Sequence, residues 1–379
     1  MSKQDKDKQP DKPSALNVRG GVDGGHDGLP GQSSGKGDDA PGKRRRLLSA
    51  REYIDGVLSG DRVLLARAIT LIESNAPSHQ ELAQEVLTAL LPERCESTRV
   101  GITGVPGAGK STLIEALGTG LTARGHKVAV TAVDPSSSLT GGSILGDKTR
   151  MEKLAADPNA FIRPSPTGGT LGGVARKTRE TIMLFEAAGY DVILVETVGV
   201  GQSEIQVRSM VDFFLLVLLA GAGDELQGIK KGVVEIADTV LVNKADGANL
   251  AAARRAQSEF ERVLHYLRPA TEGWTTCAFL SSAATGKGVM DLWTVVEKFV
   301  EQTRGSGVFD RRRTEQETAW VGSLVREGLE DLFRSHPGVA EQMAALEQQV
   351  ARGELPATTA ARRLLDLFRD GGSTLGTGL

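Results

Sequence analysis

The stretch from Arg99 to Thr112 reads RVGITGVPGAGKST, and the fold expected for the rest of the chain follows from it. It begins with a short apolar run typical of a buried strand, and apolar residues at helical spacing follow from Leu113 to Leu121. Between them, Gly104–Ser111 matches the G-x-x-x-x-G-K-[ST] phosphate loop. A strand, a glycine-rich loop and a helix in this order predict a nucleotide-binding P-loop fold.

The residue types of this loop have chemical reasons. Glycines let backbone amides converge on a polyphosphate, and the helix N-terminus adds the positive end of its dipole. We expect Lys110 to reach the β- and γ-phosphates and the hydroxyl of Ser111 to bind Mg²⁺. The predicted phosphate-binding residues are Gly104, Gly107, Ala108, Gly109, Lys110, Ser111 and Thr112.

Composition limits the classes of protein that need to be considered. The chain has 379 residues and a formal net charge of −3, which argues against a general nucleic-acid binder. No apolar run approaches the roughly eighteen residues that a membrane span needs, and the longest, 213–222, is better explained as a central strand. Cys95 and Cys277 lack the partners of a zinc site or a disulfide framework, so a reducing cytoplasm is the expected compartment.

The N-terminal region divides into two parts. Residues 1–43 are rich in Gly, Lys, Asp and Pro and nearly lack large apolar residues, so we expect a disordered tail. Residues 44–98 predict a small subdomain of three helices beside the nucleotide fold. The expected helix caps are Ser49 with Glu52, then Asp61, then Ser78 with Glu81.

Residues 99–305 predict the nucleotide-binding domain itself. Apolar strand patterns alternate with helical patterns, which is typical of an α/β fold with a mainly parallel sheet flanked by helices. The expected strands are 100–103, 128–133, 160–163, 192–195, 213–219, 239–242 and 277–280. The expected crossover helices are 111–123, 174–188, 250–267 and 289–302.

The pattern changes at residue 306, and residues 306–379 predict a C-terminal helical arm without strands. The expected helices are 314–335, 339–352 and 358–368. The first of them carries an apolar stripe, which favours dimerisation through the arm over folding back on the sheet. The stripe residues are Leu324, Leu329, Leu332 and Phe333.

The run Asn243–Asp246 reads NKAD, directly follows an expected strand, and indicates guanine rather than adenine. The carboxylate of Asp246 can accept hydrogen bonds from guanine N1–H and the 2-amino group, whereas adenine offers neither donor there. The asparagine and the lysine stem are expected to hold the loop and cover the base, and backbone amides after the next strand are expected to meet guanine O6. The predicted base-binding residues are Asn243, Lys244, Asp246, Ser282 and Ala283.

Nucleotide hydrolysis needs Mg²⁺ and a positioned water. The strand pattern at 192–195 is followed by Glu196, where a Walker-B acid would contact the metal, and by Gly199, whose amide can sense the γ-phosphate. Asp134 and Asp147, which follow the strand pattern at 128–133, are further metal or water-positioning candidates. The predicted metal ligands are Ser111, Asp134, Asp147 and Glu196, and Lys110, Asp134 and Glu196 are predicted to act in catalysis.

Seven strings occur in order along the chain: GVPGAGKST, VDPSSS, GGSILGDKTRM, RPSPTGGTLGG, ETVGVGQSE, GAGDELQGIKKG and NKAD. In these strings the chain resembles the MeaB/ArgK GTPases from about residue 44 through the C-terminal arm. The resemblance implies a slow GTPase that uses GTP, GDP and Mg²⁺ and forms homodimers through the arm.

The same resemblance implies a chaperone of a B12-dependent acyl-CoA mutase, usually methylmalonyl-CoA mutase. Such a chaperone gates the delivery of adenosylcobalamin and protects or reactivates the mutase. The charged, glycine-rich loop 223–232 corresponds to the segment that communicates with the mutase, with Lys230 as its catalytic contact in the nucleotide site. Without the resemblance, the stretch 221–232 is interpreted either as a segment that moves with the nucleotide state or as a solvated surface loop.

Three other functions remain alternatives. A nickel metallochaperone GTPase would need Cys or His ligands, and the tail has only His26. A kinase or ATPase that serves amino-acid transport would bind ATP, against which Asp246 argues. A scaffold with a structural nucleotide would not need the metal-binding acids.

Overall fold

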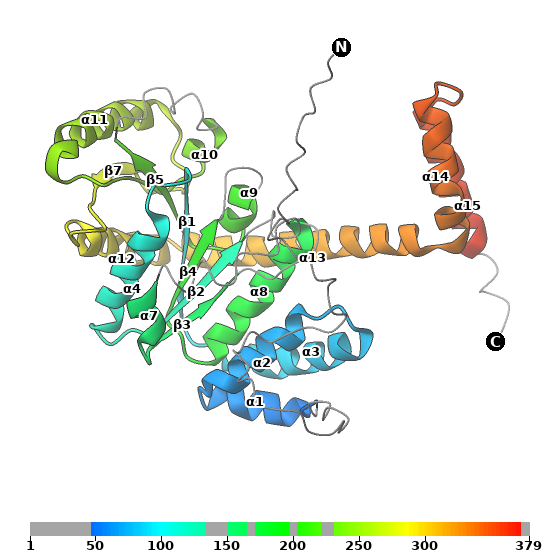
Figure 1. The fold of residues 1–379 in the computed structure, drawn as a ribbon, viewed down its shortest axis with the longest axis horizontal. Helices are drawn as coiled ribbons and strands as arrows, with labels where there is room; N and C mark the ends of the chain where they lie inside the picture. Colours follow the sequence, from blue (N-terminus) through cyan, green and yellow to red (C-terminus); the bar gives the residue numbers. More distant parts are fainter. Residues whose placement is uncertain (1–46, 134–150, 165–170, 198–202, 221–230, 373–379) are drawn as a thin grey trace, which may run out of the picture. The chain divides into compact units, whose positions relative to one another are not determined.

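The computed structural model describes residues 47–133, 151–164, 171–197, 203–220 and 231–372. From Leu48 onward these residues belong to one structural unit. Its centre is a seven-stranded sheet with helices on both faces (Figure 1). The strand order is β3-β2-β4-β1-β5-β6-β7, and every pairing is parallel, as predicted.

Apolar residues at nearly every position explain why these segments form interior strands. The interior strand β5 (Phe213–Leu219) is buried along almost its whole length, between β1 (Thr98–Gly104) and β6 (Thr239–Asn243). All seven predicted strands are confirmed, and β1, β4 and β6 extend one or two residues beyond the predicted ends. The other strands are β2 (Val128–Val133), β3 (Ala160–Arg163), β4 (Val192–Thr197) and β7 (Cys277–Leu280).

Two hydrophobic clusters lie on the two faces of the sheet. Along β4, the side chain of Leu194 belongs to one cluster and that of Ile193 to the other, because successive residues of a strand point to opposite faces. The cluster that contains Leu194 is covered by three helices. They are α4 (Lys110–Thr122), α7 (Glu152–Ala156) and α12 (Val289–Gly305).

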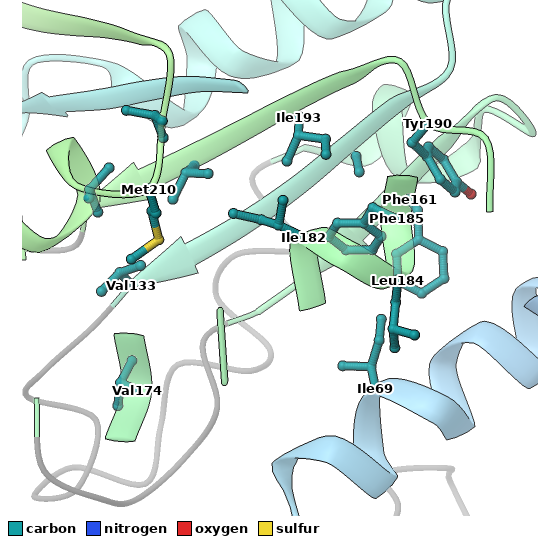
Figure 2. Close-up of a cluster of buried hydrophobic side chains, with 14 of the residues drawn as sticks. Ile69, Val133, Phe161, Val174, Ile182, Leu184, Phe185, Tyr190, Ile193 and Met210 are labelled. Carbon is teal, nitrogen blue, oxygen red and sulfur yellow. The ribbon is translucent and has the colours of Figure 1, made fainter. Parts of the chain in front are cut away.

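The opposite cluster joins the sheet to the N-terminal helices. Figure 2 shows Ile69 beside Leu184, together with the rings of Phe161, Phe185 and Tyr190. The Phe161–Phe185 and Phe185–Tyr190 ring centroids lie 5.6 and 5.8 Å apart, a favourable spacing for a tilted pair and an edge-to-face pair. The helices that contribute to this cluster are α1 (Ala50–Leu58), α2 (Arg62–Glu73), α3 (Pro77–Leu90), α8 (Leu171–Ala187), α9 (Ser203–Arg208), α10 (Lys231–Glu235) and α11 (Leu250–Tyr266).

Two of the three predicted helix caps are confirmed. Ser49 and Glu52 form the expected capping box, and the Asp61 carboxylate accepts hydrogen bonds from two backbone amides at the start of α2. The third cap, Ser78 with Glu81, is wrong. The N-cap of α3 is Ala76, and Pro77 is the first helical residue, because proline has no amide hydrogen to satisfy and its fixed φ suits the first turn.

The C-terminal arm consists of α13 (Val308–Ser335), α14 (Pro337–Ala351) and α15 (Ala357–Gly372). The three predicted helices are present, but α13 begins at Val308 rather than at residue 314. The residues between these positions include three consecutive arginines, which carry no apolar periodicity for a pattern-based prediction to detect. Two short 3₁₀ helices complete the described elements: η1 (Leu91–Glu93) and η2 (Gly247–Asn249).

These arginines hold the start of α13 to the base of the sheet. The carboxylate of Asp212, which is 1% exposed, accepts hydrogen bonds from Arg313 Nε and Nη2 at 2.8 and 2.7 Å. The fully buried carboxylate of Asp238 lies 3.2 Å from Arg208 Nη1 and 3.9 Å from Arg312 Nη1. Buried carboxylates therefore link the arm to the strands that carry the nucleotide loops.

Several predicted features lie outside the described residues. They are the tail 1–43, Asp134, Asp147, Gly199, and the loop 221–230 with Lys230. Within the described ranges, none of the helices combines the length and the apolarity that crossing a membrane would require.

Replacing Asp212 with alanine is expected to lower the free energy of unfolding by about 3–5 kcal/mol, because it leaves a guanidinium without its buried partner. Glu315→Ala is the matched control, since it removes an exposed partner of Arg311 on the same helix, and its expected cost is at most about 0.5 kcal/mol. Urea unfolding monitored by circular dichroism measures both. Equal effects of the two substitutions would contradict the proposed anchoring of the arm.

Candidate nucleotide-binding site

The predicted site residues come together at the carboxyl edge of the sheet, where doubly wound folds bind their ligands. The phosphate loop follows β1, and Glu196 lies near the end of the neighbouring strand β4, in register with Ile102. Asn243 is the last residue of β6, in register with Leu219 of β5. Parallel pairing of distant segments therefore collects loops that are far apart in sequence.

Two glycines are required by the path of the phosphate loop. Gly104 has a φ of +148°, and a Cβ there would lie 2.0 Å from the carbonyl oxygen of Val217. Gly109 has a φ of +86°, and a Cβ there would lie 2.7 Å from Asn243 Nδ2. A side chain at Gly104 would displace β5, and one at Gly109 would displace the side-chain amide of Asn243. Glycine alone therefore fits both positions.

The ammonium of Lys110 is buried inside the loop. Its Nζ donates a hydrogen bond to the carbonyl oxygen of Gly104 at 2.8 Å and a longer one to that of Val105 at 3.4 Å. Burial lowers the pKa of Lys110, while Glu196 and Glu204 act in the opposite direction. The two acidic side chains thus favour the charged lysine that the β- and γ-phosphates of a nucleotide would require.

Ser111 and Glu196, two of the predicted metal ligands, place their side-chain oxygens next to each other. The Ser111 hydroxyl donates to Glu196 Oε1 at 3.2 Å, and Glu196 is 6% exposed. Mg²⁺ prefers hard oxygen ligands and usually keeps several waters or phosphate oxygens, so this pair fits the ion. Among the residues that the structure describes, no group of three His, Cys, Asp or Glu side chains is placed to hold a metal. The other two predicted metal ligands, Asp134 and Asp147, lie outside the described residues.

The side-chain amide of Asn243 connects two loops. Its Nδ2 donates to the carbonyl oxygen of Ala108 at 2.8 Å, and its Oδ1 accepts from the backbone amide of Ala283 at 3.1 Å. Asn243 is 1% exposed, so both hydrogen bonds are shielded from water. The phosphate loop is thereby held at a fixed distance from the loop that is predicted to contact the base.

Asp246 lies next to this connection. Its Oδ2 accepts a hydrogen bond from the hydroxyl of Ser282, which aligns one carboxylate oxygen and leaves the other to accept from a base. Lys244 has a φ of +56°, an unusual conformation for a non-glycine residue, and Asn249 Nδ2 donates to its carbonyl oxygen at 2.8 Å. The loop is therefore held in a conformation that ordinary backbone preferences would not select.

The structure also adds residues to which we assigned no role from the sequence. Thr103 and Thr197 join the ends of β1 and β4 through a hydroxyl–hydroxyl bond of 2.8 Å. Glu204 of α9 is 1% exposed and acts electrostatically on Lys110. The string ETVGVGQSE contains Glu204, but its spacing from the phosphate loop gave no indication of that proximity. Thr112, by contrast, is exposed on the first turn of α4.

The fold, the phosphate loop and the residues that follow the strands define a P-loop nucleotide-binding protein. Residues 65–338 match the family model described as methylmalonyl-CoA mutase-associated GTPase MeaB. The chain belongs to the MeaB family, and it is therefore a GTP hydrolase that binds guanine nucleotides.

Individual relatives agree with this assignment. A probable GTPase of Mycobacterium tuberculosis is 55% identical over 320 residues, which cover 83% of this chain and 95% of that protein. The mitochondrial methylmalonic aciduria type A homolog of Mus musculus is 46% identical over 324 residues, 83% of this chain and 78% of that protein. GTPase ArgK of Escherichia coli is 47% identical over 276 residues, 73% of this chain and 83% of that protein.

A solved structure supports the fold independently. The crystal structure of an LAO/AO transport system kinase superposes with a TM-score of 0.69 at 35% sequence identity. The match covers 86% of this chain and 100% of that chain. The parallel sheet and its flanking helices are thus shared with a protein of experimentally determined structure.

Replacing Asp246 with asparagine is expected to weaken GTP binding about 10–100-fold, because a charged acceptor for two base donors is lost. The asparagine amide would instead donate to the carbonyl oxygen that xanthine carries in place of the guanine 2-amino group. Competition against labelled GDP should therefore show weaker GTP and stronger xanthosine triphosphate binding in the variant. If ATP displaces GDP from the wild type as well as GTP does, the proposed reading of the base is wrong.

Replacing Glu196 with alanine is expected to leave GDP binding largely intact and to slow GTP hydrolysis about 10²-fold or more, the scale of losing one preorganised electrostatic contact. Asp134→Ala should behave in the same way. Phosphate release over a range of Mg²⁺ concentrations provides the measurement, and Glu297→Ala, an exposed change on α12, is the control. Unchanged turnover in Glu196→Ala would remove this carboxylate from the mechanism.

Proposed function

We propose that this GTPase is a chaperone of a B12-dependent acyl-CoA mutase, most directly methylmalonyl-CoA mutase. The observation that carries the proposal is the match of residues 65–338 to a family described as mutase-associated GTPases. The mouse relative is named for methylmalonic aciduria type A, which points to the same metabolic context. In this role GTP binding and hydrolysis gate the loading of adenosylcobalamin and protect or reactivate the mutase.

The site supports a specific division of labour during hydrolysis. Lys110 neutralises charge on the β- and γ-phosphates, and Ser111 with Glu196 holds Mg²⁺, which stabilises the charge that develops on the transferred phosphoryl group. Asp134 and Asp147 complete the metal site or position the attacking water, and the Gly199 amide senses the γ-phosphate. Thr112 and the amides of the loop complete the phosphate contacts. Guanine is read by Asn243, Lys244, Asp246, Ser282 and Ala283.

Within this proposal the parts of the chain have separate tasks. Residues 99–305 form the GTPase domain, residues 44–98 form a helical subdomain beside it, and residues 306–379 form a dimerisation arm. Val325, Leu329 and Leu332 support the last assignment. They share one face of α13 and are 55%, 54% and 61% exposed, an apolar stripe that a second copy would bury. Analytical ultracentrifugation measures the state, and a monomer at micromolar concentration would contradict the dimer.

The name of the solved relative, an LAO/AO transport system kinase, raises a competing function, a kinase that serves a transport system. Such an enzyme would transfer the γ-phosphate to a protein or small molecule rather than to water. The orientation of Asp246 by Ser282 favours a guanine nucleotide over ATP. Binding of purified methylmalonyl-CoA mutase by the GTP-loaded chain supports the chaperone, and its absence would favour the alternative.

Replacing Lys230 with alanine is expected to lower the mutase-stimulated rate of GTP hydrolysis at least about tenfold, and far more than the rate without mutase. A cation delivered to the transferred phosphoryl group accelerates other GTPases by about 10³–10⁵-fold, and Lys230 is the proposed source here. GTP turnover with and without saturating methylmalonyl-CoA mutase is the measurement.

The neighbouring Lys231→Ala is the matched control for this experiment, because it removes the same charge one position along the chain. Full stimulation of the Lys230 variant would exclude this lysine from the response. A wild-type chain that the mutase does not stimulate at all would count against the chaperone function itself.

A further inference from the structure

A groove lies away from the nucleotide site, between α3, α8 and the arm helix α13. Its volume is about 710 Å³. We call it the α3–α8–α13 groove. The three helices come from distant parts of the sequence, and each contributes apolar side chains to its wall. These side chains are Leu87 and Leu91 from the end of α3 and the residue after it, Met183 from α8, and Trp320, Val321 and Leu324 from α13.

Part of this apolar surface is open to solvent. Val321 on α13 is 60% exposed, and Leu91, just after α3, is 47% exposed. Large side chains that line a concave surface in this way are typical of sites that receive an apolar anchor from another molecule. An amphipathic helix places its apolar residues along one face and is the kind of segment that such apolar grooves bind.

The charges around the groove are mainly negative. Glu317, Glu327 and Asp331 line it from α13, and Glu180 lines it from α8. Glu180 is only 5% exposed; burial raises its pKa, whereas Arg176, whose Nε lies 3.3 Å from Glu180 Oε1, lowers it. With four carboxylates against one guanidinium, the groove complements a cationic partner.

The wall of the groove is also connected to the nucleotide site. The guanidinium of Arg179 lies 5.4 Å from the ring centroid of Trp320, and its Nη2 donates to Ser209 Oγ at 2.9 Å, just beyond the end of α9. The same helix carries Glu204, which acts electrostatically on Lys110. Trp320 is thus linked through Arg179 to the residue that follows α9, the helix that carries Glu204.

We propose that the α3–α8–α13 groove is a docking surface for a basic amphipathic helix of the mutase. This inference rests on the proposed function and adds to it the chemistry of the contact. Apolar residues of the mutase helix pack against Trp320, Met183 and Leu324, and its Lys or Arg side chains face the acidic rim. Through Arg179, the occupied groove is linked to α9 and so to the nucleotide.

The test replaces two acidic residues at the rim of the groove with lysine and compares mutase binding with that of a variant that has the same charge change outside the groove. The variant Glu327→Lys/Asp331→Lys alters two residues that line the groove. The control Glu341→Lys/Glu347→Lys makes the same change in net charge at two exposed positions of α14 that do not line it. Full-length proteins loaded with a non-hydrolysable GTP analogue are titrated with purified methylmalonyl-CoA mutase, by calorimetry at low and high salt.

We expect the rim variant to raise the Kd about tenfold at low salt, mainly through slower association, and to lose part of the salt dependence. The control should bind as the wild type does. Mutase stimulation of GTP hydrolysis should fall in parallel, while hydrolysis without mutase stays unchanged, because neither rim residue touches the nucleotide.

Each other outcome overturns a defined part of the argument. If the wild type binds the mutase and the rim variant binds equally well, the groove is not the docking surface. If the rim variant alters sedimentation but not mutase binding, a second copy of this chain occupies the groove. If the wild type itself does not bind the mutase, the proposed function fails, and the inference that rests on it fails too.

Discussion

The side-chain amide of Asn243 is the interaction on which the nucleotide site depends. It uses its donor on the phosphate loop at Ala108 and its acceptor on the backbone amide of Ala283, with both bonds buried. An asparagine can do this because it carries a donor and an acceptor at the end of one short side chain. The distance between the phosphate loop and the base loop is thus set before any ligand arrives, and binding need not order them.

The rest of the fold serves this arrangement by keeping the strand ends fixed. Parallel strands buried on both faces bring β1, β4 and β6 to one edge, and a Cβ at Gly104 would meet the backbone of β5. Around this rigid frame, α9 is held from outside by Arg179 and by the start of α13. The preorganised site therefore lies beside a helix, α9, whose C-terminal end is held by residues of α8 and α13.

Much of this structure could be predicted from the sequence, for definite reasons. The strands were predictable because burial on both faces requires continuous apolar runs, and the phosphate loop because its glycines are sterically required. The start of α13 was not, since its arginines are ordered by Asp212 and not by local periodicity. The same is true of Glu204 and of the α3–α8–α13 groove, which exist only once segments distant in sequence have packed. At Ser78 the predicted cap is wrong because Pro77, one residue earlier, occupies the first position of the helix.

The arginines at the start of α13 also determine whether the nucleotide-binding core can be separated from the arm. The carboxylates of Asp212 and Asp238 lie at the base of the sheet, and α13 brings Arg313 to the first and Arg312 towards the second. A chain cut after α12 would leave Asp212 buried without its guanidinium, so the nucleotide-binding core is not self-sufficient. Moving this core into another protein, or exchanging arms between relatives, would therefore have to preserve the pairing of acids and arginines. Either the arginines are kept together with the core, or the acids are replaced by neutral residues.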